Sequence, residues 1–150
     1  PGSAYARSLL IEGGLAQGFA IGDAVVGPGG LIGRLVEVGA SYSRVMLVTD
    51  INSRVPVFIE QIQRTALVAG RNEVMLDMRY INQTIQRSLK RGDRVVTSGQ
   101  GGMYPAGLPV GIVVSVSQKG VLVLPYIELD ALMEVQVVSS TRPRPSAELR

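Results

Sequence analysis

One serine in this sequence is set among glycines in the way that a catalytic nucleophile often is. Ser98 lies in the segment Thr97-Ser98-Gly99-Gln100-Gly101-Gly102. Acyl transfer by such a serine needs a general base, which is usually a histidine, and the sequence contains no histidine. A Ser-Lys pair would need Lys90 or Lys119, and both stand in turns rich in polar residues, unlike the buried lysines that act as bases. The pattern therefore does not favour a hydrolase, and we expect a protein that is not an enzyme.

Phosphate and metal chemistry have no better support. The segments 27–33 and 99–102 are rich in glycine, but neither has the Gly-Lys-Ser/Thr of a phosphate-binding loop or leads into a helical pattern. Without cysteine or histidine a transition-metal site is not predicted, and no acidic residues have the spacing of a calcium loop. We expect no cofactor and no metal.

The composition favours a β protein that binds no nucleic acid. The 150 residues include 18 glycines and 8 prolines against 5 tyrosines, 2 phenylalanines and no tryptophan, which is typical of short strands joined by tight turns. The net charge of +3 arises from 15 basic and 12 acidic residues that are mixed along the chain. Mixed charges indicate a solvated surface, whereas a nucleic-acid footprint needs clustered cations. The apolar runs are too short to span a bilayer.

The strands that must position any site are related by an internal repeat. Gly22-Asp23-Ala24-Val25-Val26 recurs as Gly92-Asp93-Arg94-Val95-Val96, a shift of 70 residues (92 − 22), and Gly33 recurs as Gly111, a shift of 78 (111 − 33). The second copy is therefore longer between its two strands. Such glycines and aspartates suit tight turns, because glycine accepts positive φ and aspartate bonds nearby amides. The residues expected to form structural turns are Gly22, Asp23, Gly33, Gly92, Asp93, Gly99, Gly101, Gly102, Gly107 and Gly111.

Each copy of the repeat predicts a hairpin followed by further strands. In the first copy, residues 24–26 and 31–38 form the hairpin, and strands are expected at 44–49 and 54–60. Residues 54–60 alternate between apolar and polar, and Pro56 within them cannot donate to a ladder, which predicts an edge strand or a bulge. In the second copy, residues 134–139 match 56–60 at the shift of 78. Residues 80–91 fit a short amphipathic helix and an irregular connection equally well.

These elements predict an all-β protein of two small tandem antiparallel β-barrels related by the pseudo-repeat. We assign residues 4–69 to the first barrel and 70–140 to the second, with the alternative that the last strand returns to the first barrel. Residues 1–3 have the composition of a tag remnant, so the natural protein is expected to continue upstream of Ala4. Residues 141–150, rich in arginine and proline, are expected to be a flexible tail.

Several apolar residues occupy turns and strand ends where burial is not assured. If they are exposed together they form a patch suited to protein association, although ordinary packing explains each of them singly. The candidates for partner binding are Tyr104, Pro105, Leu108, Phe58 and Tyr126.

The same stretches resemble the periplasmic β-domain of the rod shape-determining MreC family, over about residues 7–138. The signature is longest in the second copy of the repeat, where a long ordered string of glycines, prolines and polar residues matches. The matching segments are Gly30-Leu31-Ile32-Gly33-Arg34-Leu35 with Val38, Ser43-Arg44-Val45, Leu47-Val48-Thr49-Asp50, Arg54-Val55-Pro56-Val57, and Gly92-Asp93 through Thr97-Ser98-Gly99, Gly101-Gly102, Tyr104-Pro105 and Gly107-Leu108-Pro109-Val110-Gly111.

The resemblance implies a pair of chymotrypsin-like β-barrels without catalytic residues. It also implies a scaffold of the elongation complex that organises peptidoglycan synthesis and cell shape. Such a scaffold forms a homo-oligomer, as a dimer or a filament, and binds the elongation-specific class B penicillin-binding protein, with MreD and MreB in the complex. The domain is then expected in the periplasm, anchored to the inner membrane only through an N-terminal helix that this chain lacks.

Overall fold

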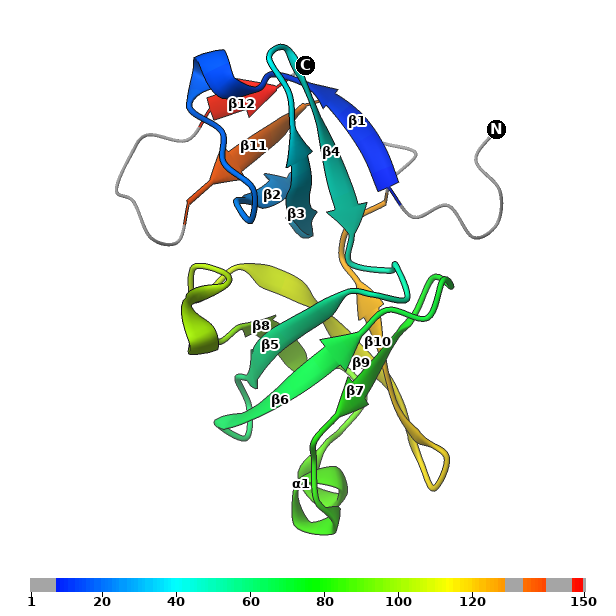
Figure 1. Ribbon diagram of the computed structural model, residues 1–150. Helices are drawn as coiled ribbons and strands as arrows, with labels where there is room; N and C mark the ends of the chain where they lie inside the picture. Colours follow the sequence, from blue (N-terminus) through cyan, green and yellow to red (C-terminus); the bar gives the residue numbers. More distant parts are fainter. Residues whose placement is uncertain (1–7, 129–133, 140–146, 150) are drawn as a thin grey trace.

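Short runs of β-branched and apolar residues, interrupted by glycine-rich turns, form the strands of two β units. The structure is a computed structural model, which describes residues 8–128, 134–139 and 147–149. Figure 1 shows an open sheet lying above a closed barrel. The prediction of an all-β fold is confirmed, with one barrel closed and the other a half-barrel sheet.

The open sheet has six antiparallel strands in the order β1-β4-β3-β2-β11-β12. A short 3₁₀ turn at Leu15–Gln17 connects β1 to the repeat. The strands are β1 (Ser8–Glu12), β2 (Ala24–Gly27), β3 (Gly30–Val38), β4 (Tyr42–Leu47), β11 (Val135–Val138) and β12 (Ala147–Leu149).

The closed barrel has six antiparallel strands in the order β10-β7-β6-β5-β8-β9, with β10 returning to β9. A helix, α1 (Gln83–Ser88), and a 3₁₀ turn at Gln100–Gly102 interrupt its connections. The strands are β5 (Arg54–Ile59), β6 (Arg64–Ala69), β7 (Leu76–Arg79), β8 (Arg94–Thr97), β9 (Pro109–Ser117) and β10 (Gly120–Pro125).

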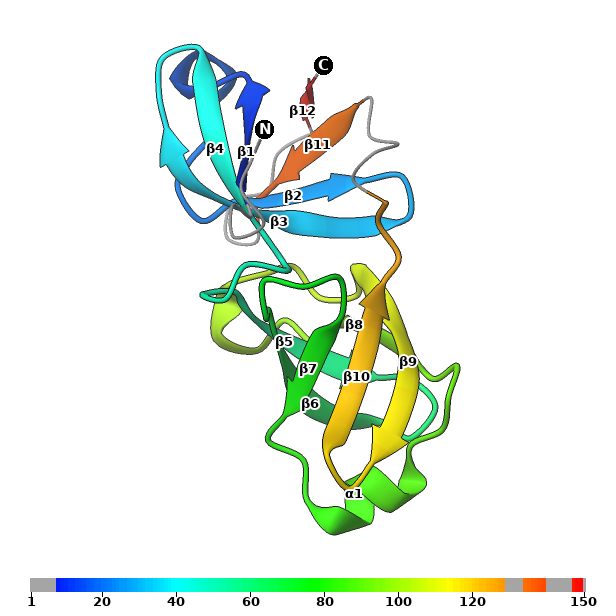
Figure 2. The same cartoon turned by 90° about the vertical axis from the view of Figure 1, so that its right-hand side faces the viewer.

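Each unit has its own apolar core because alternate residues of its strands point inward. Val57 and Ile59 of β5 are fully buried in the barrel, whereas Val25 and Leu35 lie in the core of the sheet. Leu31 of the open sheet belongs to the barrel core, so the two cores meet where the units touch. The hairpin of β2 and β3 lies across the adjoining end of the barrel (Figure 2).

The repeat is visible in the strand pairing, but the two copies exchange one strand. β5 follows the first hairpin in the chain and pairs with β8 of the second, with Ile59 opposite Val95. β11 follows the second hairpin and pairs with β2 of the first, with Val137 opposite Val25. These registers are equivalent, because they differ by the same shifts of 78 (137 − 59) and 70 (95 − 25) as the sequence repeat.

This exchange corrects the expected domain boundaries. Residues 54–69, which the sequence placed in the first barrel, form β5 and β6 of the closed barrel. β11 returns to the first sheet, the alternative left open above. Within the expected tail, Ala147–Leu149 form β12. Sequence patterning identifies strands from local alternation, whereas the choice of partner depends on contacts between distant segments.

The expectation that Pro56 marks an edge or a bulge is wrong. β5 lies between β6 and β8 inside the closed barrel and pairs with β6 without a register shift. The carbonyl of Pro56 accepts from the Ser98 amide, so the side of the residue that lacks an N–H faces β8. The β5–β8 ladder begins at Val57, and the missing donor therefore falls just beyond its end.

Candidate interaction surface

Outward-facing residues of the barrel form an apolar row across three strands. On β5, Phe58 points outward between two buried residues and lies directly opposite Val96 of β8. Val96 in turn lies opposite Pro109 of β9. Phe58 and Val96 are half-buried and Pro109 is exposed. We name this row, together with the cleft beside it, the barrel face.

The cleft of the barrel face has a volume of about 360 Å³ and lies over β5 and β6. Tyr80 stands at its margin with 82% of its surface exposed, and its backbone has a φ of 62°. A bulky residue in this left-handed region is strained, and such strain is retained mainly where the surroundings or the function require it. The cleft is lined by Pro56, Thr65, Ala66, Leu67, Tyr80, Gln100 and Gly101.

Tyr126 and an ion pair border the barrel face on the side of β9. The Arg94 guanidinium donates from Nε to Oε1 of Glu60 at 3.0 Å. Burial raises the pKa of Tyr126, while Arg94 lowers it and Glu60 raises it, so the phenol lies near this pair. The Tyr126 amide donates to the Val110 carbonyl at 3.0 Å, which fixes the residue against β9.

Tyr104, a candidate for partner binding whose burial the sequence left open, does not reach the surface. Only 2% of its surface is exposed, and its ring packs in the barrel core. Burial raises the pKa of the phenol to about 12, and Arg34 of β3 opposes this rise. The extra residues of the second copy therefore place an aromatic ring at the end of the barrel that faces the open sheet.

Thr97 holds the elongated turn in place. Its hydroxyl donates to the Pro105 carbonyl at 2.6 Å and accepts from the Leu108 amide at 2.8 Å. Pro105 is half-buried, and Leu108 packs against the barrel core. Of the five residues predicted to bind a partner, Phe58 and Tyr126 lie on or beside the barrel face, and the other three support the turn.

The barrel face contains residues that the sequence did not single out. Val96 and Pro109 follow from strand alternation only once β8 is known to lie between β5 and β9. For Tyr80 the sequence carries no signal of the left-handed backbone, because glycine, asparagine and aspartate are the residues usually found there.

The two Gly-Asp turns have the same geometry. Asp23 accepts from the Ala20 amide at 3.0 Å, and Asp93 accepts from the Lys90 amide at 2.8 Å. The preceding glycines, Gly22 and Gly92, both have positive φ. The remaining predicted turn glycines with positive φ are Gly99, Gly101, Gly102 and Gly107.

Gly33 and Gly111 have a different role from the turn glycines. They occupy equivalent places in β3 and β9, where a Cβ would collide with the carbonyl oxygens of Met46 and Leu124 respectively. Each glycine therefore allows the neighbouring strand to approach.

Ser98 takes part in the turn that follows β8. Its hydroxyl accepts from the Gln100 amide at 3.1 Å and so belongs to the turn. Within residues 8–128, 134–139 and 147–149, no three acidic side chains gather as a metal site. The helices of this part of the chain include none that is long and apolar enough to cross a membrane.

Fold and surface together define an all-β domain of two strand-exchanged units that carries an apolar outer face. The model of the family "Rod shape-determining protein MreC, barrel core" matches residues 1–139, and the chain belongs to this family. The family membership predicted from the sequence resemblance is thereby confirmed.

The relatives include cell shape-determining proteins. The MreC protein of Caulobacter vibrioides is 40% identical over 110 residues, which cover 73% of this chain and 31% of the relative. That of Cereibacter sphaeroides is 39% identical over 110 residues, covering 73% and 36%. The chain thus matches about a third of the length of these relatives.

Solved structures share the fold. MreC from Pseudomonas aeruginosa is 29% identical with a TM-score of 0.83, and the match covers 92% of each chain. A structure described as the major periplasmic domain of the cell shape-determining filament MreC has a TM-score of 0.72 at 24% identity, covering 87% of each chain. A complex between penicillin-binding protein PBP2 and MreC from Helicobacter pylori has a TM-score of 0.50 at 22% identity, covering 68% of this chain and 64% of that one.

Proposed function

We propose that this chain is the periplasmic β-domain of a cell-shape scaffold that binds a class B penicillin-binding protein through the barrel face. The observation that carries the proposal is the apolar row of Phe58, Val96 and Pro109, which continues through Thr65, opposite Phe58, to the cleft lined by the exposed Tyr80. Aromatic residues next to an apolar cleft are typical anchors of protein interfaces. The solved complex of a relative with PBP2 supports this class of partner.

Binding to the periplasmic region of the elongation-specific class B penicillin-binding protein from the same organism tests the barrel face. The double variant Phe58→Ser/Tyr80→Ser removes both rings and should weaken binding at least about tenfold, since truncating interface anchors costs more than about 1 kcal/mol each. The control is Ile21→Ser, because Ile21 is 69% exposed in the other unit. Unchanged affinity of the double variant, measured by biolayer interferometry on folded protein, would contradict the proposal.

We further propose that copies of the chain self-associate through the open sheet. β1 and β12 stand at its two ends, and each pairs with one strand among the described residues. Unpaired edge groups readily accept another strand. Placing a charge on β1 with Leu10→Lys should lower the average mass seen in sedimentation, whereas Phe58→Ser should leave it unchanged. Equal masses for Leu10→Lys and the parent chain would argue against the edge. For the whole protein, we propose that this scaffold acts in a complex with MreB and MreD.

A further inference from the structure

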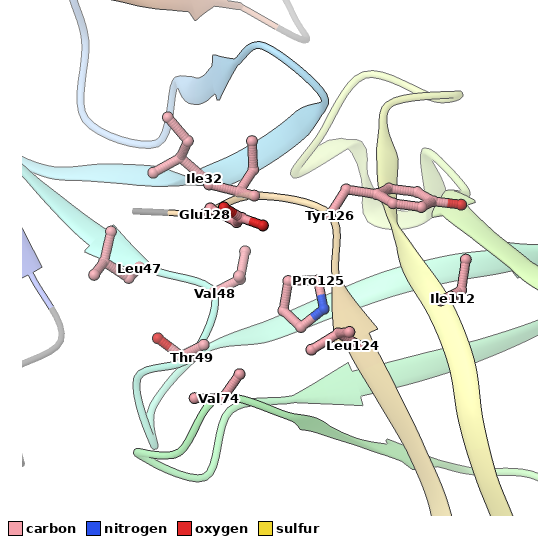
Figure 3. A pocket seen from close by; sticks show the side chains of 11 residues that line it. Ile32, Leu47, Val48, Thr49, Val74, Ile112, Leu124, Pro125, Tyr126 and Glu128 are labelled. Atoms are coloured by element: carbon pink, nitrogen blue, oxygen red, sulfur yellow. The ribbon is translucent and has the colours of Figure 1, made fainter. Parts of the chain in front are cut away.

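A groove of about 680 Å³ lies between the two units, apart from the barrel face. Figure 3 shows Leu47, Val48 and Thr49 on one side and Pro125 on the other, with Ile32 above and Val74 below. The lining is mainly apolar, which suits a bound hydrophobic group, and the volume falls within the range of ordinary ligand sites.

The groove is built where the chain crosses between the units. Val48 and Thr49 leave β4 for the barrel, and Tyr126 and Ile127 leave β10 for the open sheet. These segments are equivalent under the repeat shift of 78 residues (126 − 48). The ring of Tyr126, which also lines the groove, points away from Val48 and toward β9 (Figure 3).

Polar groups without partners line this apolar space. Thr49 is 8% exposed, and its hydroxyl oxygen is buried with no hydrogen-bond partner among the described residues. A buried hydroxyl of this kind costs free energy until it finds a partner. No hydrogen bond joins the backbone of Ile127 or Glu128 to another described residue. An extended peptide can supply hydrogen bonds to such backbone groups.

The groove has a negative rim although the chain as a whole has a charge of +3. Glu128 lines it and forms no ion pair within the described part of the chain. Asp50 and Glu73 directly adjoin two lining residues, Thr49 and Val74. Two cations lie close by: Arg71 is bound to Glu73 at 3.0 Å, and Arg54 donates to the Ile51 and Ser53 carbonyls beside Asp50. A ligand with a positive group beside its apolar part would match this rim.

We propose that the groove binds an extended peptide segment in which a large apolar side chain stands next to lysine or arginine. The apolar side chain occupies the space between Val48 and Pro125, and the cation meets Glu128. The peptide backbone pairs with the backbone of Ile127. This site adjoins the barrel face at Tyr126 but shares none of its residues, so a peptide can occupy it independently of the penicillin-binding protein proposed above.

The test uses four synthetic hexapeptides titrated into the isotope-labelled chain and followed by NMR. The acetylated sequence Gly-Lys-Leu-Phe-Lys-Gly is the probe, and the others replace both lysines by glutamate, both apolar residues by serine, or all four. We expect saturable shifts of the Thr49, Ile127 and Glu128 amides with the first peptide. The apparent affinity should fall as salt is raised, because the rim is exposed to solvent.

Two variants and a control make the result specific to the groove. Glu128→Gln should weaken the basic peptide about two- to fivefold, the range of an exposed ion pair. Val74→Ser, at a position that is 66% exposed and can change without unfolding the chain, should weaken it about fivefold through lost apolar contact. Ile51→Ser, 47% exposed and outside the groove, should leave the affinity unchanged.

Three outcomes would overturn the proposal. One is the absence of saturable shifts with the Lys-Leu-Phe-Lys peptide. Another is equal response to the glutamate peptide, which would exclude the charged rim. The third is a shift confined to Phe58, Tyr80 and Val96, which would place the peptide on the barrel face. Loss of penicillin-binding protein affinity in Phe58→Ser/Tyr80→Ser bears only on the barrel face, so the two proposals can fail separately.

Discussion

At the scale of single residues, Tyr104 shows how local sequence can misdirect. Its neighbours are glycine, methionine and proline in a turn, a composition typical of an exposed tip. The ring is nevertheless buried, because the turn folds back over the barrel end toward Arg34. Phe58 and Tyr126, whose burial the sequence left open, are both half-buried. The Tyr104 ring is buried by barrel-core residues that are distant in sequence, so the local sequence carries no signal of this burial.

Burial of Tyr104 predicts a loss of stability in alkaline solution. The phenol pKa is about 12 in the folded chain against 10.0 when exposed, so the unfolded state loses its proton first as the pH rises. The free energy of unfolding should therefore fall between pH 10 and pH 12, by up to about 3 kcal/mol, and be unaffected below that window. Urea unfolding of the parent chain and Tyr104→Phe across this range checks the prediction, because the variant should lack this fall. Tyr80→Phe is the matched control and should keep it.

Thr97 gives a second prediction at this scale. Thr97→Val keeps the shape of the side chain but removes both hydrogen bonds that hold the elongated turn. Because the Leu108 amide and the Pro105 carbonyl lose a partner, the free energy of unfolding should fall by about 1–3 kcal/mol. Chemical denaturation measures the loss. A change below about 0.5 kcal/mol would show that the turn does not depend on this hydroxyl.

At the scale of elements, the sequence predicts the internal repeat but not which strands of the two copies pair with each other. The Gly-Asp turns and the two hairpins follow from residue types at fixed spacing, and the structure contains both hairpins. Even the register shifts agree, since β2 has one between Val25 and Val26 and β8 has one between Val95 and Val96. Which hairpin takes β5 and which takes β11 depends on long-range contacts, and sequence alternation is the same for either choice.

We expect alanine substitutions at the equivalent glycines Gly33 and Gly111 to destabilise the fold in the same way. Gly111→Ala would place a methyl group against the Leu124 carbonyl of the adjacent strand. We expect a loss of about 1–3 kcal/mol in the free energy of unfolding, because backbone atoms cannot shift as a side chain can. Gly33→Ala should cost a similar amount, since the Met46 carbonyl stands in the same place. Ser115→Ala on the same strand as Gly111 serves as the control, and near-neutral values for both alanines would refute the close approach.

At the scale of the whole molecule, the exchanged strands tie the two units together. The closed barrel contains all of its strands between residues 54 and 125, whereas the open sheet is completed by β11. Val135 and Val137 of β11 are buried in the core of the open sheet. The open sheet therefore needs a strand from the C-terminal part of the chain and the barrel does not, although the repeat makes the two units similar in sequence.

Removing everything after residue 128 should therefore affect the two units unequally. The barrel keeps its six strands, and the open sheet loses the apolar side chains of β11. Amide hydrogen exchange should show lost protection in β2 and β3 with protection largely kept in β5 and β6. The full chain, by contrast, should protect both units. Equal loss in both units of the shortened chain would mean that the barrel depends on β11 as well.

β2 pairs with β11, which is synthesised much later. The order in which the chain emerges during synthesis therefore affects when the open sheet can form. A chain that appears from its N-terminus exposes β1 to β4 first, yet the apolar edge of β2 meets its partner only after the whole barrel segment has followed. Closing so long a loop is slow relative to local pairing. The barrel is thus free to fold first and to hold the two ends of the sheet near each other. A nascent chain arrested before Val135 would present an unfinished β2 edge, the kind of surface that chaperones bind.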